Sequence, residues 1–230
     1  MTPSTSMMLT GDPGYGKSTL LRQLANSITN QGHIALYNVG EESLFQVKMR
    51  CEEMGLTHGF KVGQEVFVGK VLAYARELQQ QFPQKQVFIL QDSLQTLNDG
   101  HYKDGGITSK TPVRCCELMT NWAKETYGIV VFIGQVTKNG VFVGKNTIRH
   151  MIDVHCELLL DDNKESESCG QRIFTISKNR FGPSGIAHAY SLTKKGIFAN
   201  DVKDVNESND SSSSGVRRVV RLHEEEETGT

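Results

Sequence analysis

The sequence predicts an α/β fold in which a mostly parallel sheet is covered by helices on both faces. Three observations support this class. Apolar, strand-like runs alternate with segments of helical spacing through more than half of the chain. A glycine-rich octapeptide joins the first strand-like run to the first helical segment. The later segments instead read as consecutive strands separated by polar turns, and these are expected to extend the sheet in antiparallel fashion.

The elements follow from these patterns in chain order. Apolar or β-branched runs predict strands at 6–10, 34–39, 66–68, 87–90 and 129–133. Helical spacing predicts helices at 18–30, 44–54, 70–81 and 113–127. The consecutive strands are expected at 154–160, 172–177 and 186–191. We therefore expect one folded core over 1–195 and an acidic, disordered tail over 196–230, where serine and acidic residues dominate.

Composition limits the class of protein. The chain has 230 residues, of which 37% are hydrophobic and 22% charged, as in ordinary soluble globular proteins. No apolar run is long enough for a membrane span, and the first residues lack the pattern of a signal peptide. The five cysteines form no C-x-x-C pair, so neither a zinc site nor a disulfide framework is indicated. A reduced, cytoplasmic setting is expected.

Charge is distributed unevenly. The net charge is −1, but residues 201–230 hold eight acidic and four basic side chains, which leaves the preceding residues mildly basic. Such a balance permits binding to nucleic acid without requiring it.

Residues 11–18 read Gly-Asp-Pro-Gly-Tyr-Gly-Lys-Ser, a complete phosphate-binding loop of the pattern G-x-x-x-x-G-K-[ST]. The glycines let successive backbone N–H groups point at one anion, and the following helix presents its N-terminus to the phosphates. Lys17 supplies a charge for the β- and γ-phosphates, and Ser18 offers a hydroxyl to Mg²⁺. We expect a nucleotide, ATP or GTP, to be held by Gly11, Asp12, Pro13, Gly14, Tyr15, Gly16, Lys17, Ser18 and Thr19.

Acidic residues that follow two of the predicted strands are candidates for the remaining chemistry of nucleotide hydrolysis. Asp92 ends the 87–90 strand, where a Walker-B carboxylate would hold Mg²⁺ directly or through water; the alternative is an ordinary strand-end aspartate. Glu41 and Glu42 follow the second strand, where a carboxylate can accept a proton from the attacking water. We expect Glu41 to be the base. The alternative, which does not exclude it, is a helix start capped by Ser43.

Three further residues extend this prediction. Gln135 follows the 129–133 strand and can hydrogen-bond the γ-phosphate, or it is only a polar residue at a strand end. Lys178 and Arg180 lie two apart after the 172–177 strand and project the same way from an extended chain. They could clamp phosphate, reach the nucleotide of a neighbouring subunit, or form a basic surface turn.

Taken together, these motifs resemble the ATPase core of the bacterial DNA-repair family RadA, also called Sms. The resemblance extends over roughly residues 6–192 and rests on the phosphate loop, on Tyr-Asn-Val-Gly-Glu-Glu-Ser at 37–43, on Gln-Val-Thr-Lys-Asn-Gly at 135–140, on His-Met-Ile-Asp at 150–153 and on Lys-Asn-Arg-Phe-Gly at 178–182. The last of these is the most discriminating, since phosphate loops occur in many families.

The resemblance implies a RecA-like fold, Mg²⁺-dependent ATP hydrolysis and a homo-oligomeric ring, such as a hexamer, that moves along single-stranded DNA in recombination or repair. It implies roles for Lys17, Ser18, Asp92 and Glu41 as above, for Gln135 as γ-phosphate sensor, and for Lys178 and Arg180 across a subunit boundary. The loops at 97–112 and 137–147 would face DNA, with phosphate contacts from Lys103, Lys110, Arg114, Lys138 and Lys145. Other recombination or replication proteins are possible partners.

The chain also departs from that family. It has no four-cysteine zinc pattern and no protease-like C-terminal domain, so a minimal ATPase core is expected. A different class therefore stays open, namely a KaiC-like oligomeric switch or scaffold that binds protein partners rather than DNA. A non-hydrolysing relative is disfavoured because Lys17, Glu41 and Asp92 are all present.

Overall fold

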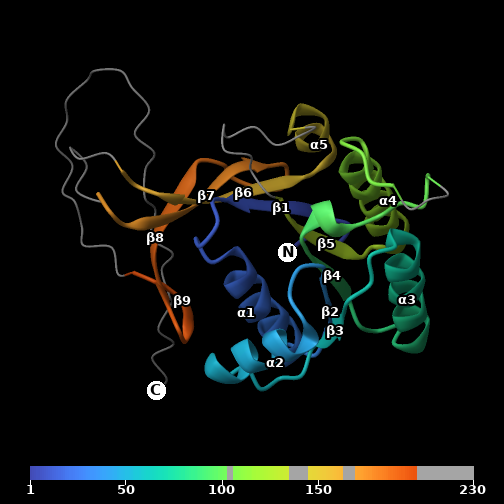
Figure 1. Cartoon of the computed structure of the whole chain (residues 1–230), viewed down its shortest axis with the longest axis horizontal. Helices are drawn as coiled ribbons and strands as arrows, with labels where there is room; N and C mark the ends of the chain where they lie inside the picture. Colours follow the sequence, from blue (N-terminus) through green and yellow to red (C-terminus); the bar gives the residue numbers. More distant parts are fainter. Residues whose placement is uncertain (103–105, 135–144, 163–168, 201–230) are drawn as a thin grey trace, which may run out of the picture.

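The computed structural model describes residues 1–102, 106–134, 145–162 and 169–200. Within these residues, nine strands form a single sheet in the order β3-β2-β4-β5-β1-β6-β7-β8-β9 (Figure 1). The parallel part comprises β1 (Ser6–Gly11), β2 (Ile34–Val39), β3 (Lys61–Gly63), β4 (Val87–Asp92), β5 (Ile129–Ile133) and β6 (Val154–Leu160). The antiparallel part comprises β7 (Arg172–Asn179), β8 (Ile186–Thr193) and β9 (Gly196–Ala199).

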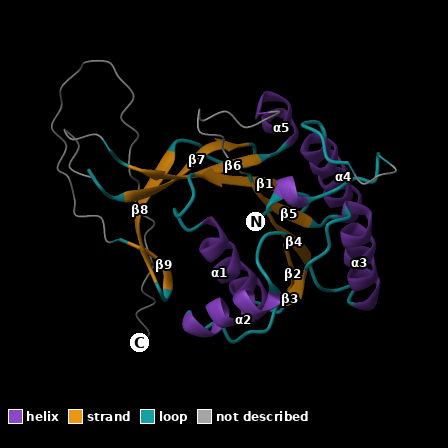
Figure 2. Cartoon of the chain, viewed as in Figure 1, coloured by secondary structure: helices purple, strands orange, loops and turns teal. Residues whose placement is uncertain are grey.

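Helices cover both faces of the parallel part (Figure 2). They are α1 (Lys17–Asn30), α2 (Leu44–Glu53), α3 (Val68–Gln81), α4 (Thr111–Thr126) and α5 (Lys145–Met151), with a short 3-10 turn, η1, at Leu94–Thr96. Because successive side chains of a strand point to opposite faces, each buried strand contributes to two separate cores. One core packs under α3, α4 and α5, and the other packs under α1 and α2.

The predicted fold class is confirmed, and most predicted elements lie within a few residues of the observed ones. The strand predicted at 66–68 is wrong. Val68 begins α3, and the edge strand is instead Lys61–Gly63. This strand is three residues long and mostly exposed, so it shows no apolar run or alternation that could reveal it.

Three further differences concern the second half of the chain. The β6 strand was expected to extend the sheet in antiparallel fashion, but it runs parallel to β1, and antiparallel pairing begins at its other neighbour, β7. The short helix α5 was not predicted; it begins inside the stretch 137–147, which was expected to be a loop, and continues to Met151. The strand β9 was not predicted, and it continues the sheet four residues beyond the expected boundary at 195. Residues 201–230, expected to be disordered, lie outside the described residues.

Candidate nucleotide-binding site

The phosphate-binding loop connects the carboxyl end of β1 to the N-terminus of α1. Gly11, Gly14 and Gly16 have φ values of 147°, 82° and 93°, so the loop uses backbone conformations that other residues rarely adopt. Gly16 is the N-cap of α1 and no side chain caps this helix. The N–H groups of its first turn are therefore available to an anion.

Lys17 folds back over this loop. Its Nζ donates to the carbonyl oxygens of Gly11 at 2.8 Å and Asp12 at 2.9 Å. Burial lowers the pKa of Lys17, while the carboxylates of Asp92, Asp12 and Glu41 act in the opposite direction. The ammonium thus lies where a phosphate bound by the loop would meet it.

Asp92 ends β4 two strands away from β1, with β5 between them. Its side chain accepts hydrogen bonds from Ser18 and from the Tyr37 hydroxyl, the latter at 2.8 Å to Oδ2. Burial raises the pKa of Asp92, and these two hydrogen bonds oppose that shift. The carboxylate and the Ser18 hydroxyl are hard oxygen ligands side by side at the phosphate loop, which fits a Mg²⁺ ion shared with nucleotide phosphates.

Tyr37 completes this arrangement from β2. Its ring is fully buried, and burial raises its pKa well above the ordinary value, with Asp92 adding to the effect. The phenol therefore keeps its proton and remains a hydrogen-bond donor. Sequence analysis overlooked Tyr37; the signal that could have revealed it was a polar aromatic next to Asn38 in an otherwise apolar strand.

Glu41 and Glu42 point to different partners. Glu41 accepts a hydrogen bond from Ser93 Oγ at 3.0 Å, beside Asp92. Its negative charge favours the protonated form of Lys17 and so opposes the lowering of the Lys17 pKa by burial. Glu42 instead forms an ion pair with Arg22, a residue of α1 whose side chain is only 4% exposed. The predicted cap is also present, since Ser43 and Gln46 form a capping box at the start of α2.

A cavity of about 300 Å³ opens beside the phosphate loop, between α1, the end of α2 and the turn joining β8 to β9. Sequence analysis did not single out the residues on its far side, Arg50, Met54, Leu192, Thr193 and Lys194. The β8–β9 hairpin is held there by two hydrogen bonds between Gln23 and Ile197, at 3.1 and 2.8 Å. A third bond, from the Tyr190 hydroxyl to the Tyr15 carbonyl at 2.7 Å, ties it to the phosphate loop.

Lys178 and Arg180 lie near the ends of the strands opposite to the ends that carry their own phosphate loop. Gly11 of the phosphate loop is paired in register with Leu158 of β6. The backbone N–H of Arg180 instead bonds to the carbonyl of Asp153, which precedes Leu158 by five positions along the chain. Five positions of a strand span about 16 Å. The Arg180 side chain points further away still, to Asp153 Oδ1 at 3.1 Å and to the carbonyl of His150 at 2.9 Å.

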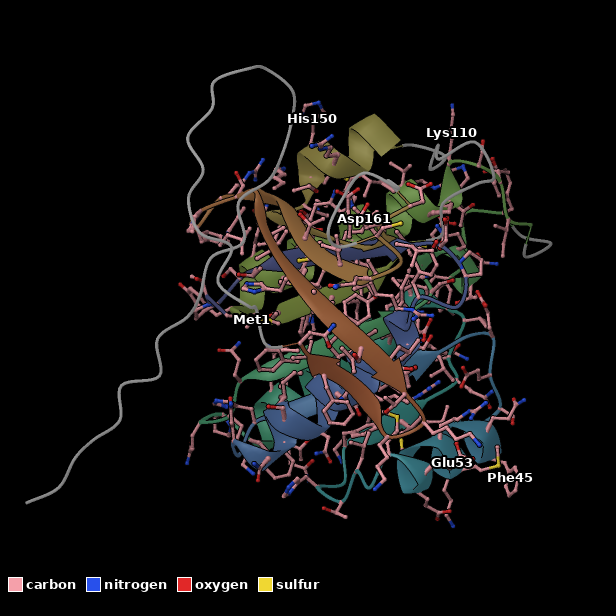
Figure 3. The ribbon with its side chains drawn as sticks, turned by 90° about the vertical axis from the view of Figure 1, so that its left-hand side faces the viewer. Met1, Phe45, Glu53, Lys110, His150 and Asp161 are labelled. Carbon is pink, nitrogen blue, oxygen red and sulfur yellow. The ribbon has the colours of Figure 1, made fainter. Side chains whose placement is uncertain are left out.

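Lys178 shares this location. Its Nζ donates to the carbonyls of Arg149 at 2.6 Å and Ile152 at 2.5 Å, and burial together with the nearby Arg180 lowers its pKa. In Figure 3, His150 lies at one end of the molecule and Phe45 of α2 at the other. The structure therefore does not bring Lys178 and Arg180 together with Lys17, Asp92 and Glu41 of the same chain.

The predicted DNA-facing positions are only partly described. Lys103 and Lys138 lie outside the described residues, as does the side chain of Lys145. Gln135, the predicted γ-phosphate sensor, also lies outside them. Lys110 is exposed at the start of α4 (Figure 3). Arg114 is paired with Asp99, and its guanidinium carbon lies 5.8 Å from the centre of the Tyr102 ring.

Two absences hold for the residues that the structure describes. None of their helices combines the length and apolar character needed to cross a membrane. No group of three or more histidine, cysteine or acidic side chains among them could hold a metal ion without further ligands.

Comparison with solved structures places the fold. The chain resembles the ATPase domain of G40P, with a TM-score of 0.70 and 14% identity over 85% of this chain and 84% of that one. It also resembles a DnaB-like replicative helicase, with a TM-score of 0.73 and 15% identity over 84% of this chain and 56% of that one. A KaiC-like protein from the archaeon Pyrococcus horikoshii gives 0.65, with 14% identity over 86% and 90%. Fold and site thus define a P-loop protein with a RecA-like ATPase fold.

Comparison of the amino-acid sequence finds curated relatives named DNA repair protein RadA. DNA repair protein RadA of Haemophilus influenzae is 31% identical over 196 residues, that of Escherichia coli is also 31% identical, and that of Mycolicibacterium smegmatis is 33% identical. These matches cover 83–85% of this chain but only 40% of each relative. No protein-family model matches the chain. The chain is similar in sequence to these RadA proteins, and it spans about 40% of the length of the curated relatives that it matches.

Proposed function

We propose that this protein is a Mg²⁺-dependent ATPase that acts on single-stranded DNA in recombination or repair, as a homo-oligomeric ring in the cytoplasm. One observation carries the proposal. The phosphate loop, Asp92 and Glu41 meet at one end of the sheet, while Lys178 and Arg180 lie about 16 Å away along the strands, at the other end.

Within one subunit, each group has a separate task. The phosphate loop and Lys17 hold the triphosphate, and Ser18 and Asp92 hold Mg²⁺, which neutralises charge on the phosphate oxygens. Glu41 accepts the proton of the water that attacks the γ-phosphate, and Ser93 keeps its carboxylate in place. The cavity beside the loop receives the ribose and base, with Met54 and Leu192 as apolar walls.

The remaining groups come from a second subunit. Arg180 is 48% exposed, and its guanidinium cannot reach its own phosphate loop, so it is positioned to serve the nucleotide of a neighbour. Lys178 acts beside it. Gln135 senses the γ-phosphate and transmits its presence to the loop at 137–147, which contacts DNA together with the loop at 97–112.

A KaiC-like switch that binds protein partners is the second candidate. Two observations favour it. The Phe45 side chain, on the outer face of α2, is 75% exposed beside the half-exposed Leu44. Arg114, one of the expected DNA contacts, is already paired with Asp99.

Binding to a labelled oligonucleotide separates the two candidates. The full chain is mixed with single-stranded DNA and a non-hydrolysable ATP analogue at increasing salt, and ATP hydrolysis and particle mass are measured in parallel. The proposed motor predicts binding that weakens steeply with salt, faster hydrolysis with DNA, and the mass of a ring. A nucleotide-dependent ring that shows no DNA binding at low salt would instead favour the switch.

A further inference from the structure

Arg22 is an unusual residue for its position. It lies on the face of α1 that packs against the sheet, together with Leu21, Ala25 and Ile28, and its side chain is only 4% exposed. A buried guanidinium is costly unless it is paired and hydrogen-bonded. Glu42 provides the ion pair, and Nε has no hydrogen-bond partner among the described residues.

The buried guanidinium lies against Tyr37. Its central carbon is 5.8 Å from the centre of the Tyr37 ring, within the range of a cation–π contact. On another side, the ring of Phe60 meets Tyr37 edge-on, with centroids 5.9 Å apart and an interplanar angle of 88°. The Tyr37 ring is therefore held by Arg22 and Phe60 and has little freedom to move.

The Tyr37 hydroxyl in turn reaches Asp92. Because Tyr37 is level with Leu90 in the paired strands, Tyr37 and Asp92 are diagonal neighbours on the same face of the sheet. The hydroxyl donates to Asp92 Oδ2 at 2.8 Å. The last torsion of an aspartate side chain is broad and nearly two-fold, so without such a bond the carboxylate could turn.

We propose that Tyr37 is a positioning residue for the Mg²⁺ site: it fixes the orientation of the Asp92 carboxylate, and the Arg22–Glu42 ion pair keeps Tyr37 in place. This inference rests on the proposed role of Asp92. It also assigns Glu42 a task different from that of Glu41, since Glu42 holds Arg22 rather than acting on water. Groups that orient metal ligands in this way commonly change metal affinity by 10- to 100-fold.

The test measures Mg²⁺ affinity rather than turnover. A fluorescent ADP analogue is bound to the full chain in EDTA and then titrated with Mg²⁺, which gives the Mg²⁺ concentration at half-maximal change. Tyr37→Phe keeps the ring and removes only the hydroxyl. We expect its Mg²⁺ midpoint to rise on the order of tenfold, while analogue affinity in EDTA stays within about twofold of the wild type.

A matched control is Tyr190→Phe. It also removes a buried tyrosine hydroxyl near the phosphate loop, but this hydroxyl donates to the Tyr15 carbonyl and not to Asp92. Any effect of this control should be the same with and without Mg²⁺. Arg22→Gln, which weakens the support of the ring, should shift the Mg²⁺ midpoint in the same direction as Tyr37→Phe and by less.

Asp92→Ala separates failure of the inference from failure of the proposed function. If Asp92→Ala raises the Mg²⁺ midpoint while Tyr37→Phe and Arg22→Gln match the wild type, the positioning role is wrong and the metal site stands. If Asp92→Ala leaves the midpoint unchanged, both the metal site and the positioning role are overturned.

Discussion

The Ser93 hydroxyl donates a hydrogen bond to Glu41 across the end of the sheet, with 3.0 Å between Oγ and Oε1. The two residues come from different strand ends, since Glu41 follows β2 and Ser93 follows β4. This bond holds one of two adjacent glutamates beside Asp92. Glu42, the next residue, is instead turned to Arg22.

We predict that Glu41→Gln lowers the rate of ATP hydrolysis by about 10²- to 10⁴-fold, because an amide cannot accept the proton of the attacking water. Nucleotide affinity should change little. Glu42→Gln is the matched control: at saturating Mg²⁺ it should lower hydrolysis far less, but weaken the ion pair with Arg22 and destabilise the fold by about 1–3 kcal/mol. Steady-state hydrolysis and urea unfolding measure both effects. The reverse pattern would make Glu42 the base.

Gly40→Ala should displace Glu41 from Ser93. A Cβ at Gly40 would lie 2.1 Å from Oγ1 of Thr96 in η1, too close for the loop to keep its position. We expect hydrolysis to fall by at least tenfold, together with a loss of stability of about 1–3 kcal/mol. Gly32→Ala is a suitable control. Gly32 has a φ of 83° but open space around it, so alanine there should cost about 1 kcal/mol and leave the rate per folded molecule unchanged. Equal rates for the two variants would contradict the prediction.

Arg180→Ala should lower hydrolysis in the assembled protein by about 10³-fold or more, as expected for an arginine that stabilises the transferring phosphate from a neighbouring subunit. Nucleotide binding to each subunit should survive. Mixing Arg180→Ala with Lys17→Ala subunits should restore part of the activity, because the second variant supplies an intact Arg180 to the active site of the first.

A double variant provides the control for that mixture. Subunits that carry both Lys17→Ala and Arg180→Ala offer no arginine, so mixing them with Arg180→Ala subunits should restore nothing. If Arg180→Ala alone hydrolyses ATP normally, Arg180 has only its structural bonds to Asp153 and His150.

Asp92→Asn should stabilise the nucleotide-free protein at neutral pH. Burial raises the pKa of Asp92 above its ordinary value of 3.8, so the folded state holds this proton more tightly than the unfolded chain. The protonated carboxyl therefore stabilises the folded state fully at pH values below the ordinary pKa, and this stabilisation is lost as the pH rises through the raised pKa of the folded state. At pH 7 the ionised carboxylate therefore destabilises the folded state, and Asp92→Asn should raise the free energy of unfolding by about 0.5–2 kcal/mol.

Urea unfolding at several pH values checks this sign. The advantage of Asp92→Asn over the wild type should be present at pH 7 and shrink as the pH falls toward 4. Excess Mg²⁺ and ADP should make the wild type more stable than Asp92→Asn at pH 7, because Mg²⁺ binds the ionised carboxylate of Asp92 more strongly than the amide of asparagine. An asparagine variant less stable than the wild type at pH 7 without nucleotide would contradict the prediction.

The parts of the fold that could be predicted are those with local signals. Continuous apolar runs such as Val87–Leu90 and the loop at 11–18 depend on few neighbours, so their elements were placed nearly correctly. The strand β3 and the pairing of β6 with β1 depend on contacts between residues far apart in the chain, which local patterns do not encode.

The candidate site divides in the same way. Lys17, Ser18, Glu41 and Asp92 follow strand ends in a recognisable order, and their proximity follows from a parallel sheet. Tyr37 and Arg22 were not predicted as site residues, because a tyrosine in a strand and an arginine in a helix are ordinary in sequence. Their roles follow only from the contacts of Tyr37 with Arg22 and Asp92 in the folded protein. The same holds for Met54 and Leu192 in the cavity wall.

The β8–β9 hairpin has a consequence for how the protein is made. Gln23 and Ile197, whose two hydrogen bonds attach the hairpin to α1, are 174 residues apart. On the ribosome, the phosphate loop emerges early, but the wall of the adjacent cavity that the β8–β9 turn supplies exists only after nearly all of the described core has been synthesised. A nucleotide bound in this cavity would therefore contact the β8–β9 turn only late in synthesis, after the strands of the parallel sheet have emerged.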